Sequence, residues 1–304
     1  MTSRFTHRLT FRLTFRPASR SLAAALAASA LLAFTIPAAL AASALLAFTI
    51  PAARGAEALT VFAAGSTGGA LATIAHDYTA ATGQPVKLVT GPAGLLLERI
   101  EGGARADLFI SANLAHPRQL TAEGKAGPTV VFARNRVCVS ARPDVGLTSA
   151  KLLDKLLDPG VKIGTSTPKA DPGGDYAWLL FEKAGTLRAG ATAVLEAKAR
   201  QLVGGRSAPE VPAGANPVKY FMQTHVVDVF VGYCSSHDTQ PDPAFVQVEL
   251  PPELAIQADY GMTVLEGRHD EAAWRFAMYL MSPAAQAVLP RYGFGAVGLA
   301  DPGS

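Results

Sequence analysis

The feature that most constrains the fold of this 304-residue chain is a repeated succession of an apolar segment, a glycine-rich turn and an amphipathic helix. After the turn at 65–69, for example, Leu71, Ile74, Ala75 and Tyr78 recur at helical spacing. Strands alternating with helices predict an α/β fold with a mostly parallel sheet and right-handed crossovers. The strands expected in this first part are 59–64, 86–89 and 107–111.

A second succession of the same kind follows two extended segments, 130–133 and 136–141. We expect helices at 149–157, 175–183, 215–224, 271–281 and 283–292, and strands at 161–164, 226–234 and 261–265. Two α/β units with extended connections predict two lobes joined by a hinge, with the last helices returning to the first lobe. The boundaries expected are 59–138 plus 236–304 for the first lobe and 139–235 for the second.

The first 58 residues predict a signal peptide and therefore export to the periplasm. Residues 1–20 carry five arginines and no acid, residues 21–53 carry no charge, and Ala56-Glu57-Ala58 is a small-x-small cleavage pattern. The apolar run is long because residues 27–39 recur identically at 41–53. An uncleaved membrane anchor is therefore the alternative interpretation.

The charge distribution gives no sign of nucleic-acid binding. Six of the 27 Lys and Arg residues and one of the 24 Asp and Glu residues precede Leu59, so the exported part carries a net charge of −2. The six histidines are scattered, and no metal-binding motif or cofactor is expected. Cys138 and Cys234 are compatible with one disulfide in an oxidising compartment, or equally with two separately buried thiols.

Three strand-to-helix turns are rich in glycine and small residues: 65–69, 91–94 and 171–174. The start of a helix presents unpaired backbone N–H groups and the positive end of the helix dipole, so it attracts anions without a basic side chain. In open α/β sheets such turns lie where ligands bind. Each turn alone is also explained by the need for a tight bend.

The first turn allows an enzymatic interpretation. Gly65-Ser66-Thr67-Gly68 lies between a strand and a helix and comes close to the G-x-S-x-G nucleophile elbow. A serine hydrolase would also need a histidine base, and His225, His237 and His269 follow without a recognisable loop context. The chain has no P-loop or dinucleotide-binding fingerprint.

From residue 59 to 295 the chain resembles the periplasmic molybdate-binding proteins of ABC importers. The stretches that carry the resemblance are VFAAGS (61–66), ERIEGGARADLFISA (98–112), FARNR (132–136), YGMTVL (260–265), YLMSPAAQ (279–286) and RYGFG (291–295). The resemblance implies the two-lobe periplasmic binding protein fold of type II. It also implies a monomer without catalysis or cofactor that captures molybdate or tungstate and delivers it to a membrane permease.

The resemblance further implies a ligand shell of hydroxyls and backbone amides. The matching positions are Ser66, Ala93, Gly173, Ala215 and Tyr233, with Thr67, Gly94 and Asn216 as secondary positions. Ser66 and Tyr233 match hydroxyl donors, whereas Gly173 and either Ala215 or Asn216 match amide donors. Ala93 stands where the family has a serine, and Thr67 is the nearest residue that could replace the missing hydroxyl.

The departure at Ala93 keeps another small anion, such as sulfate or phosphate, as the alternative ligand. Molybdate and sulfate bring no proton near neutral pH and need only donors, whereas phosphate keeps a proton and needs an acceptor. Asp171 and Asp175 flank the third turn and could accept that proton, although capping of the helix is the expected role of each. An exported sensor domain is a further alternative.

Overall fold

The computed structural model describes residues 56–235, 242–267 and 269–297. The leader up to residue 55 lies outside this range, as do the expected signal peptide within it and its alternative, the membrane anchor. In the described part of the chain, no helix is both long and apolar enough to cross a membrane.

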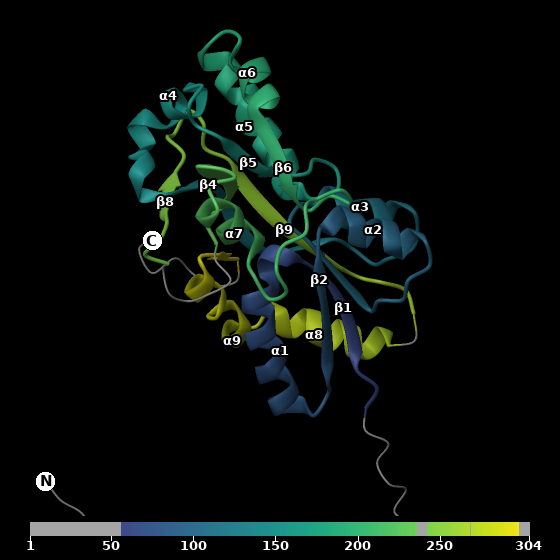
Figure 1. The fold of residues 1–304 in the computed structure, drawn as a ribbon. Helices are drawn as coiled ribbons and strands as arrows, with labels where there is room; N and C mark the ends of the chain where they lie inside the picture. The colour runs from purple at the N-terminus through teal and green to yellow at the C-terminus, as the bar shows by residue number, and fades with distance from the viewer. Residues whose placement is uncertain (1–55, 236–241, 268, 298–304) are drawn as a thin grey trace, which may run out of the picture. The chain divides into compact units, whose positions relative to one another are not determined.

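The first lobe begins with the expected β-α-β-α-β succession (Figure 1). β2 and β3 both pair with β1 in parallel, and apolar side chains of all three strands contribute to one core. Gly83 ends α1 in the left-handed conformation, which glycine adopts without a steric penalty. The elements are β1 (Leu59–Ala64), the 3-10 helix η1 (Gly65–Thr67), α1 (Gly68–Thr82), β2 (Val86–Gly91), α2 (Ala93–Glu101), β3 (Leu108–Ser111) and α3 (Ala115–Ala122).

β4 (Val130–Ala141) joins the lobes as one continuous strand, where two extended segments were expected. Up to Arg136 it pairs with β9 of the first lobe, and from Val137 onward it pairs with β7 of the second. The strands thus form one sheet in the order β2-β1-β3-β9-β4-β7-β5-β6, with β8 and β10 pairing with β4. This topology confirms the α/β fold with two lobes, in each of which the strands that alternate with helices pair in parallel, β1 with β2 and β3, and β5 with β6 and β7.

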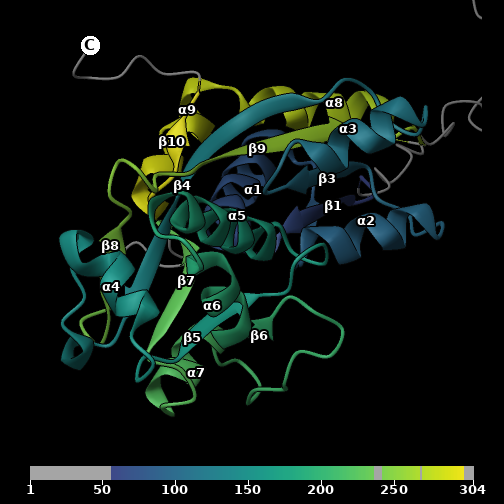
Figure 2. The same cartoon turned by 90° about the horizontal axis from the view of Figure 1, so that it is seen from above.

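The second lobe has its own core, and Figure 2 shows its helices α5, α6 and α7 grouped around β5, β6 and β7, below the first lobe. The short α6, β6 and β8 were not expected from the sequence because few of their residues face the core. The elements are η2 (Pro143–Val145), η3 (Ser149–Lys151), α4 (Leu152–Leu157), β5 (Ile163–Ser166), α5 (Pro172–Leu187), α6 (Ala191–Lys198), β6 (Ala199–Val203), α7 (Pro217–Gln223), β7 (Val229–Tyr233) and β8 (Val246–Glu249).

The chain returns to the first lobe later than the boundary expected at residue 236. Val248, Leu250, Leu254 and Ile256 pack in the core of the second lobe, and the return occurs at β9. The last helices pack on the first lobe, as expected, with Phe276 and Leu289 in its core. The closing elements are β9 (Gln257–Val264), α8 (Asp270–Leu280), α9 (Pro283–Gln286), the 3-10 helix η4 (Leu289–Tyr292) and β10 (Gly295–Ala296).

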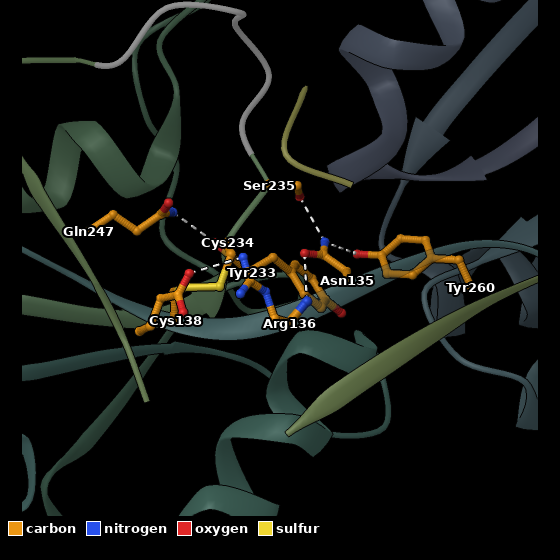
Figure 3. Close-up of a disulfide and its surroundings, with 9 residues drawn as sticks. Asn135, Arg136, Cys138, Tyr233, Cys234, Ser235, Gln247 and Tyr260 are labelled. Carbon is orange, nitrogen blue, oxygen red and sulfur yellow. Dashed lines mark hydrogen bonds and ion pairs between the residues drawn. A yellow bond between two sulfur atoms is a disulfide. The ribbon is translucent and has the colours of Figure 1, made fainter. Parts of the chain in front are cut away.

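A disulfide between Cys138 and Cys234 ties β4 to the end of β7, close to the point where β4 passes between the lobes (Figure 3). The Cα atoms are 5.0 Å apart and the cysteines are separated by 96 positions in the chain. Of the two alternatives that the sequence left open, a disulfide or two separately buried thiols, the structure has the disulfide. In the chain-entropy model, closing a loop of this length stabilises the fold by about 4–5 kcal/mol.

Candidate functional site

Ser66 belongs to a buried hydrogen-bonded group at the carboxyl end of β1. Its Oγ lies 2.9 Å from the hydroxyl of Tyr260 on β9, whose side chain is fully buried. The side-chain amide of Asn135 on β4 donates to the same tyrosine hydroxyl at 3.2 Å. Ser66 itself is partly exposed. The hydrogen-bonded side chains therefore extend from the sheet interior to the surface at the turn that starts α1.

Tyr233, the last residue of β7, carries a buried hydroxyl without a partner. Its ring lies between those of Tyr176 and Tyr260, at centroid distances of 6.1 and 5.7 Å. Among the described residues, no group forms a hydrogen bond with its Oη. A buried unpaired hydroxyl costs about 1–3 kcal/mol, so such groups are rare and indicate a polar partner from outside the chain.

All three tyrosines are held in their neutral form. Burial raises the pKa of Tyr233 well above its ordinary value, and burial likewise raises the pKa of Tyr260. Burial, together with the charges of Asp259 and Asp175, raises the pKa of Tyr176 to about 12. The hydroxyls therefore keep their hydrogens through the neutral and mildly basic range, and the unpaired hydroxyl of Tyr233 can donate to an anion.

The start of α5 lies directly beside Tyr233. Gly173 approaches so closely that a Cβ there would be 3.5 Å from the tyrosine ring and 3.3 Å from Ser166 Oγ. The Gly173 N–H donates to Asp171 Oδ1 at 3.2 Å, so Asp171 caps the helix as expected. Burial raises the pKa of Asp171, while hydrogen bonds from Gly173 and Ser166 act in the opposite direction.

The start of α2 forms a direct contact between the lobes. Ala93 is fully buried, and the N–H groups of Gly94 and Leu95 donate to the carbonyl of Ala170 in the second lobe at 3.0 and 3.3 Å. A Cβ on Gly94 would lie 2.1 Å from the carbonyl oxygen of Lys169, so only glycine fits here. The amide that was predicted to bind the ligand at Gly94 is thus engaged by the opposite lobe.

Two more contacts hold the lobes together around these turns. The Tyr176 hydroxyl on α5 donates to the Ala112 carbonyl after β3 at 3.1 Å. Arg206 of the second lobe forms an ion pair with Glu98 on α2. The starts of α1, α2 and α5 therefore converge between two lobes that are in contact.

The family of this chain follows from a match over residues 59–295 to the bacterial extracellular solute-binding proteins. The chain belongs to that family. It is 38% identical over 178 residues to an uncharacterised protein of Pasteurella multocida, an alignment covering 58% of this chain and 73% of the relative.

Two solved structures show the same fold as this solute-binding protein. The periplasmic molybdate-binding protein of Azotobacter vinelandii has a TM-score of 0.64 and 20% identity, covering 79% of this chain and 99% of its own. The sulfate-binding protein SubI of Mycobacterium tuberculosis has a TM-score of 0.63 and 17% identity, covering 81% of this chain and 88% of its own. At these identities the likeness establishes the fold alone, which is that of the type II periplasmic binding proteins.

The structure of the solute-binding protein brings Ser66, Ala93, Gly173 and Tyr233 to this junction but gives the other predicted positions local roles. The Thr67 hydroxyl is buried and donates to the Ala64 carbonyl at 2.7 Å, so it neither caps α1 nor replaces the hydroxyl missing at Ala93. The Ala215 N–H donates to the Pro212 carbonyl at 3.0 Å. Asn216 caps α7 by accepting from the Lys219 N–H at 3.2 Å. These bonds connect neither residue to Ser66 or Tyr233.

Tyr260, Asn135 and Tyr176 were not predicted as site residues. Asn135 stands between Arg134 and Arg136 on β4, so nothing in its local sequence marks it as a buried side chain. Tyr260 and Tyr176 look like ordinary core aromatics in the sequence.

Two open surface hollows of the described part lie elsewhere. One of about 520 Å³ borders α1 and β2, and one of about 710 Å³ borders the amino ends of β1 and β3. None of the predicted ligand residues lines either hollow.

Proposed function

We propose that this solute-binding protein captures a small tetrahedral oxyanion, molybdate or tungstate, at the junction of its two lobes. The observation that carries the proposal is the buried, unpaired hydroxyl of Tyr233, which faces the junction beside the start of α5. A charged oxygen of the anion would accept a hydrogen bond from the Tyr233 hydroxyl and remove the free-energy cost of burying that hydroxyl without a partner. The neutral state of the tyrosines suits this role, because a deprotonated hydroxyl would repel an anion.

The surroundings of Tyr233 supply further donors of the right kind. Ser66 is hydrogen-bonded to Tyr260 at the start of the first glycine-rich turn, where helix N–H groups and the helix dipole favour negative charge. Uncharged donors on both lobes would draw the lobes together around the ligand. The fold shared with a molybdate-binding protein agrees with this function.

Transport is the physiological role that we propose. The leader, the small-x-small pattern at Ala56-Glu57-Ala58 and the family's extracellular character support export to the periplasm. The loaded protein would then deliver its anion, as a monomer, to the membrane permease of an ABC importer.

Sulfate or phosphate is the second candidate ligand. The likeness to a sulfate-binding protein favours the first, and a carboxylate with a raised pKa, Asp171, beside the junction favours the second. Catalysis by Ser66 has less support: its hydroxyl partner is Tyr260, and no described histidine is hydrogen-bonded to it.

Calorimetric titration of the exported, processed protein with molybdate, tungstate, sulfate and phosphate tests this function. We expect one anion per chain, with molybdate or tungstate bound at least about tenfold more tightly than the others, a difference of about 1.4 kcal/mol. Tighter binding of sulfate or phosphate would show that the ligand is that anion and would leave the proposed site unchanged. No binding of any oxyanion would refute the proposal.

A further inference from the structure

The segment 233–235, which ends β7 and follows it, lies where β4 passes from the first lobe to the second. Tyr233 pairs with Val137, the first residue of β4 that pairs with the second lobe. Cys234 donates its N–H to the Arg136 carbonyl at 2.8 Å, and Arg136 still pairs with β9 of the first lobe. The hydroxyl of Tyr233 is therefore carried by the end of a strand, at the crossing point between the lobes.

The same segment also contacts the first lobe. The side-chain amide of Asn135 donates to Ser235 Oγ at 2.8 Å (Figure 3). Gly293, which precedes β10, packs so closely that an added Cβ would lie 3.1 Å from the Cys234 carbonyl oxygen and 3.1 Å from Ser235 Cα. The segment 233–235 is thus held between the two lobes, although β7 belongs to the second.

The disulfide is the covalent bond that holds this segment on β4. It joins Cys234 to Cys138, which directly follows Val137, and keeps the two Cα atoms 5.0 Å apart. The end of a strand that is held by hydrogen bonds alone opens at a low free-energy cost. Such opening would displace Tyr233, the neighbour of Cys234 in the chain, and the disulfide prevents it.

Given the proposed function of the Tyr233 hydroxyl, we propose that the Cys138–Cys234 disulfide positions Tyr233, so that the oxidation state of the two cysteines sets the affinity for the oxyanion. A hydroxyl that is already in place when the anion arrives needs no further ordering, and this raises the affinity. The oxidised protein therefore binds tightly and the reduced protein weakly. Tight binding is confined in this way to an oxidising compartment.

Reduction by a dithiol converts one state into the other. Cys138 is buried and Cys234 is partly exposed, so a thiolate of the dithiol attacks Sγ of Cys234 and forms a mixed disulfide with it. The bond between the two protein sulfurs breaks, and Cys138 leaves as a thiolate that takes up a proton. The second thiol of the reagent then closes the reagent's own disulfide and releases Cys234 as a thiol. The cysteine pair gains two electrons and two protons, and the dithiol loses them.

Titration with molybdate tests whether the disulfide affects the affinity. Wild-type protein is reduced with dithiothreitol, separated from the reagent under anaerobic conditions, and compared with oxidised wild-type protein and with Cys138→Ala/Cys234→Ala. We expect the reduced protein and the double variant to bind about tenfold more weakly than the oxidised protein. Treatment with dithiothreitol should leave the double variant unchanged. Equal affinity of the oxidised and reduced forms would overturn the proposal.

Leu152→Ala separates positioning from a loss of stability. Leu152 is fully buried in the core of the second lobe, on α4, which packs against α6. Its truncation destabilises the fold, as loss of the disulfide does, but leaves the segment 233–235 in place. Measured where every variant is folded, Leu152→Ala should bind molybdate as the oxidised wild type does. If Leu152→Ala weakened binding as much as reduction, the effect would belong to stability and the proposal would be wrong.

A double-mutant cycle tests whether the disulfide acts through Tyr233. In Tyr233→Phe the hydroxyl that the bond positions is absent, so reduction should change the affinity of this variant by less than about threefold. A purely structural role of the disulfide would leave its effect unaltered in Tyr233→Phe. Effects of reduction and substitution that multiply would therefore contradict the proposal.

Gly293→Ala displaces the same segment while the disulfide stays intact. We expect this variant to bind molybdate about threefold to tenfold more weakly than the wild type, because its Cβ meets Cys234 and Ser235. Gly190→Ala is the matched control: the two glycines have φ values of 82° and 79°, but nothing lies within 4 Å of a Cβ on Gly190. Unchanged affinity in Gly293→Ala would count against the proposal, even if the double cysteine variant failed to fold.

Failure of the proposed function itself gives a different pattern. In that case oxidised wild-type protein would bind no oxyanion, or Tyr233→Phe would bind molybdate as tightly as the wild type. If only the role of the disulfide is wrong, Tyr233→Phe still weakens binding and the oxidation state of the cysteines has no effect.

Discussion

Tyr233→Phe is expected to weaken oxyanion binding by about tenfold to more than a hundredfold while leaving the fold intact. The variant removes a hydrogen bond to a charged group, which contributes about 1.5–3 kcal/mol, and each 1.4 kcal/mol is a factor of ten in affinity. The unliganded protein should be as stable or slightly more stable, because the Tyr233 hydroxyl is buried without a partner. Calorimetry and thermal unfolding of the unliganded variant measure the two effects separately.

The opposite combination of results would contradict this role. If Tyr233→Phe lowered the melting temperature and left the affinity unchanged, the hydroxyl would be part of the fold and the anion would bind elsewhere. Tyr78→Phe is a suitable control, because Tyr78 is a buried tyrosine whose ring packs against Phe276 and Tyr279 of α8, away from the junction.

Gly94→Ala is expected to weaken binding by roughly tenfold to a hundredfold by preventing the lobes from meeting. Its Cβ would lie 2.1 Å from the Lys169 carbonyl and 2.8 Å from that of Ala170, both backbone atoms of the opposite lobe. Overpacking of this kind costs about 1–3 kcal/mol. Because the clash lies at the contact between the lobes and not within the core of either lobe, the affinity for molybdate should fall more than the stability of the unliganded protein.

Gly91→Ala provides the matched control for Gly94→Ala. It lies in the same turn, but its added Cβ would be 3.8 Å from the Leu96 side chain, an ordinary van der Waals contact. Its affinity should equal that of the wild type. If Gly94→Ala also bound normally, the ligand would be held without this contact between the lobes.

The fold was largely predictable from the sequence because long apolar periodicities set its main elements. α1 repeats Leu71, Ile74 and Tyr78 on its buried face, and β1 and β3 are mostly apolar. β8 was missed because only Val248 of its four residues is buried. The late return to the first lobe was missed because β8 pairs with β4, which is distant in the sequence. The local sequence pattern does not reveal a contact of this kind.

The candidate site could be proposed from the sequence only where a turn or a family motif indicates it. Ser66 and Gly173 lie in glycine-rich turns, whose link to anion binding is a general property of helix starts. The hydrogen-bond partner of Ser66 is 194 positions away at Tyr260, and the engagement of Gly94 by Ala170 depends on how the two lobes meet. Such contacts depend on tertiary packing and have no signature within the local sequence.

Anomalous diffraction at the molybdenum edge, from crystals of the processed protein grown with molybdate, tests the central claim most directly. The account predicts one strong peak at the junction of the lobes, positioned so that anion oxygens lie within hydrogen-bond distance of Tyr233 Oη and Ser66 Oγ. A peak in either surface hollow, or an ordered anion at the junction that contacts neither hydroxyl, would contradict it.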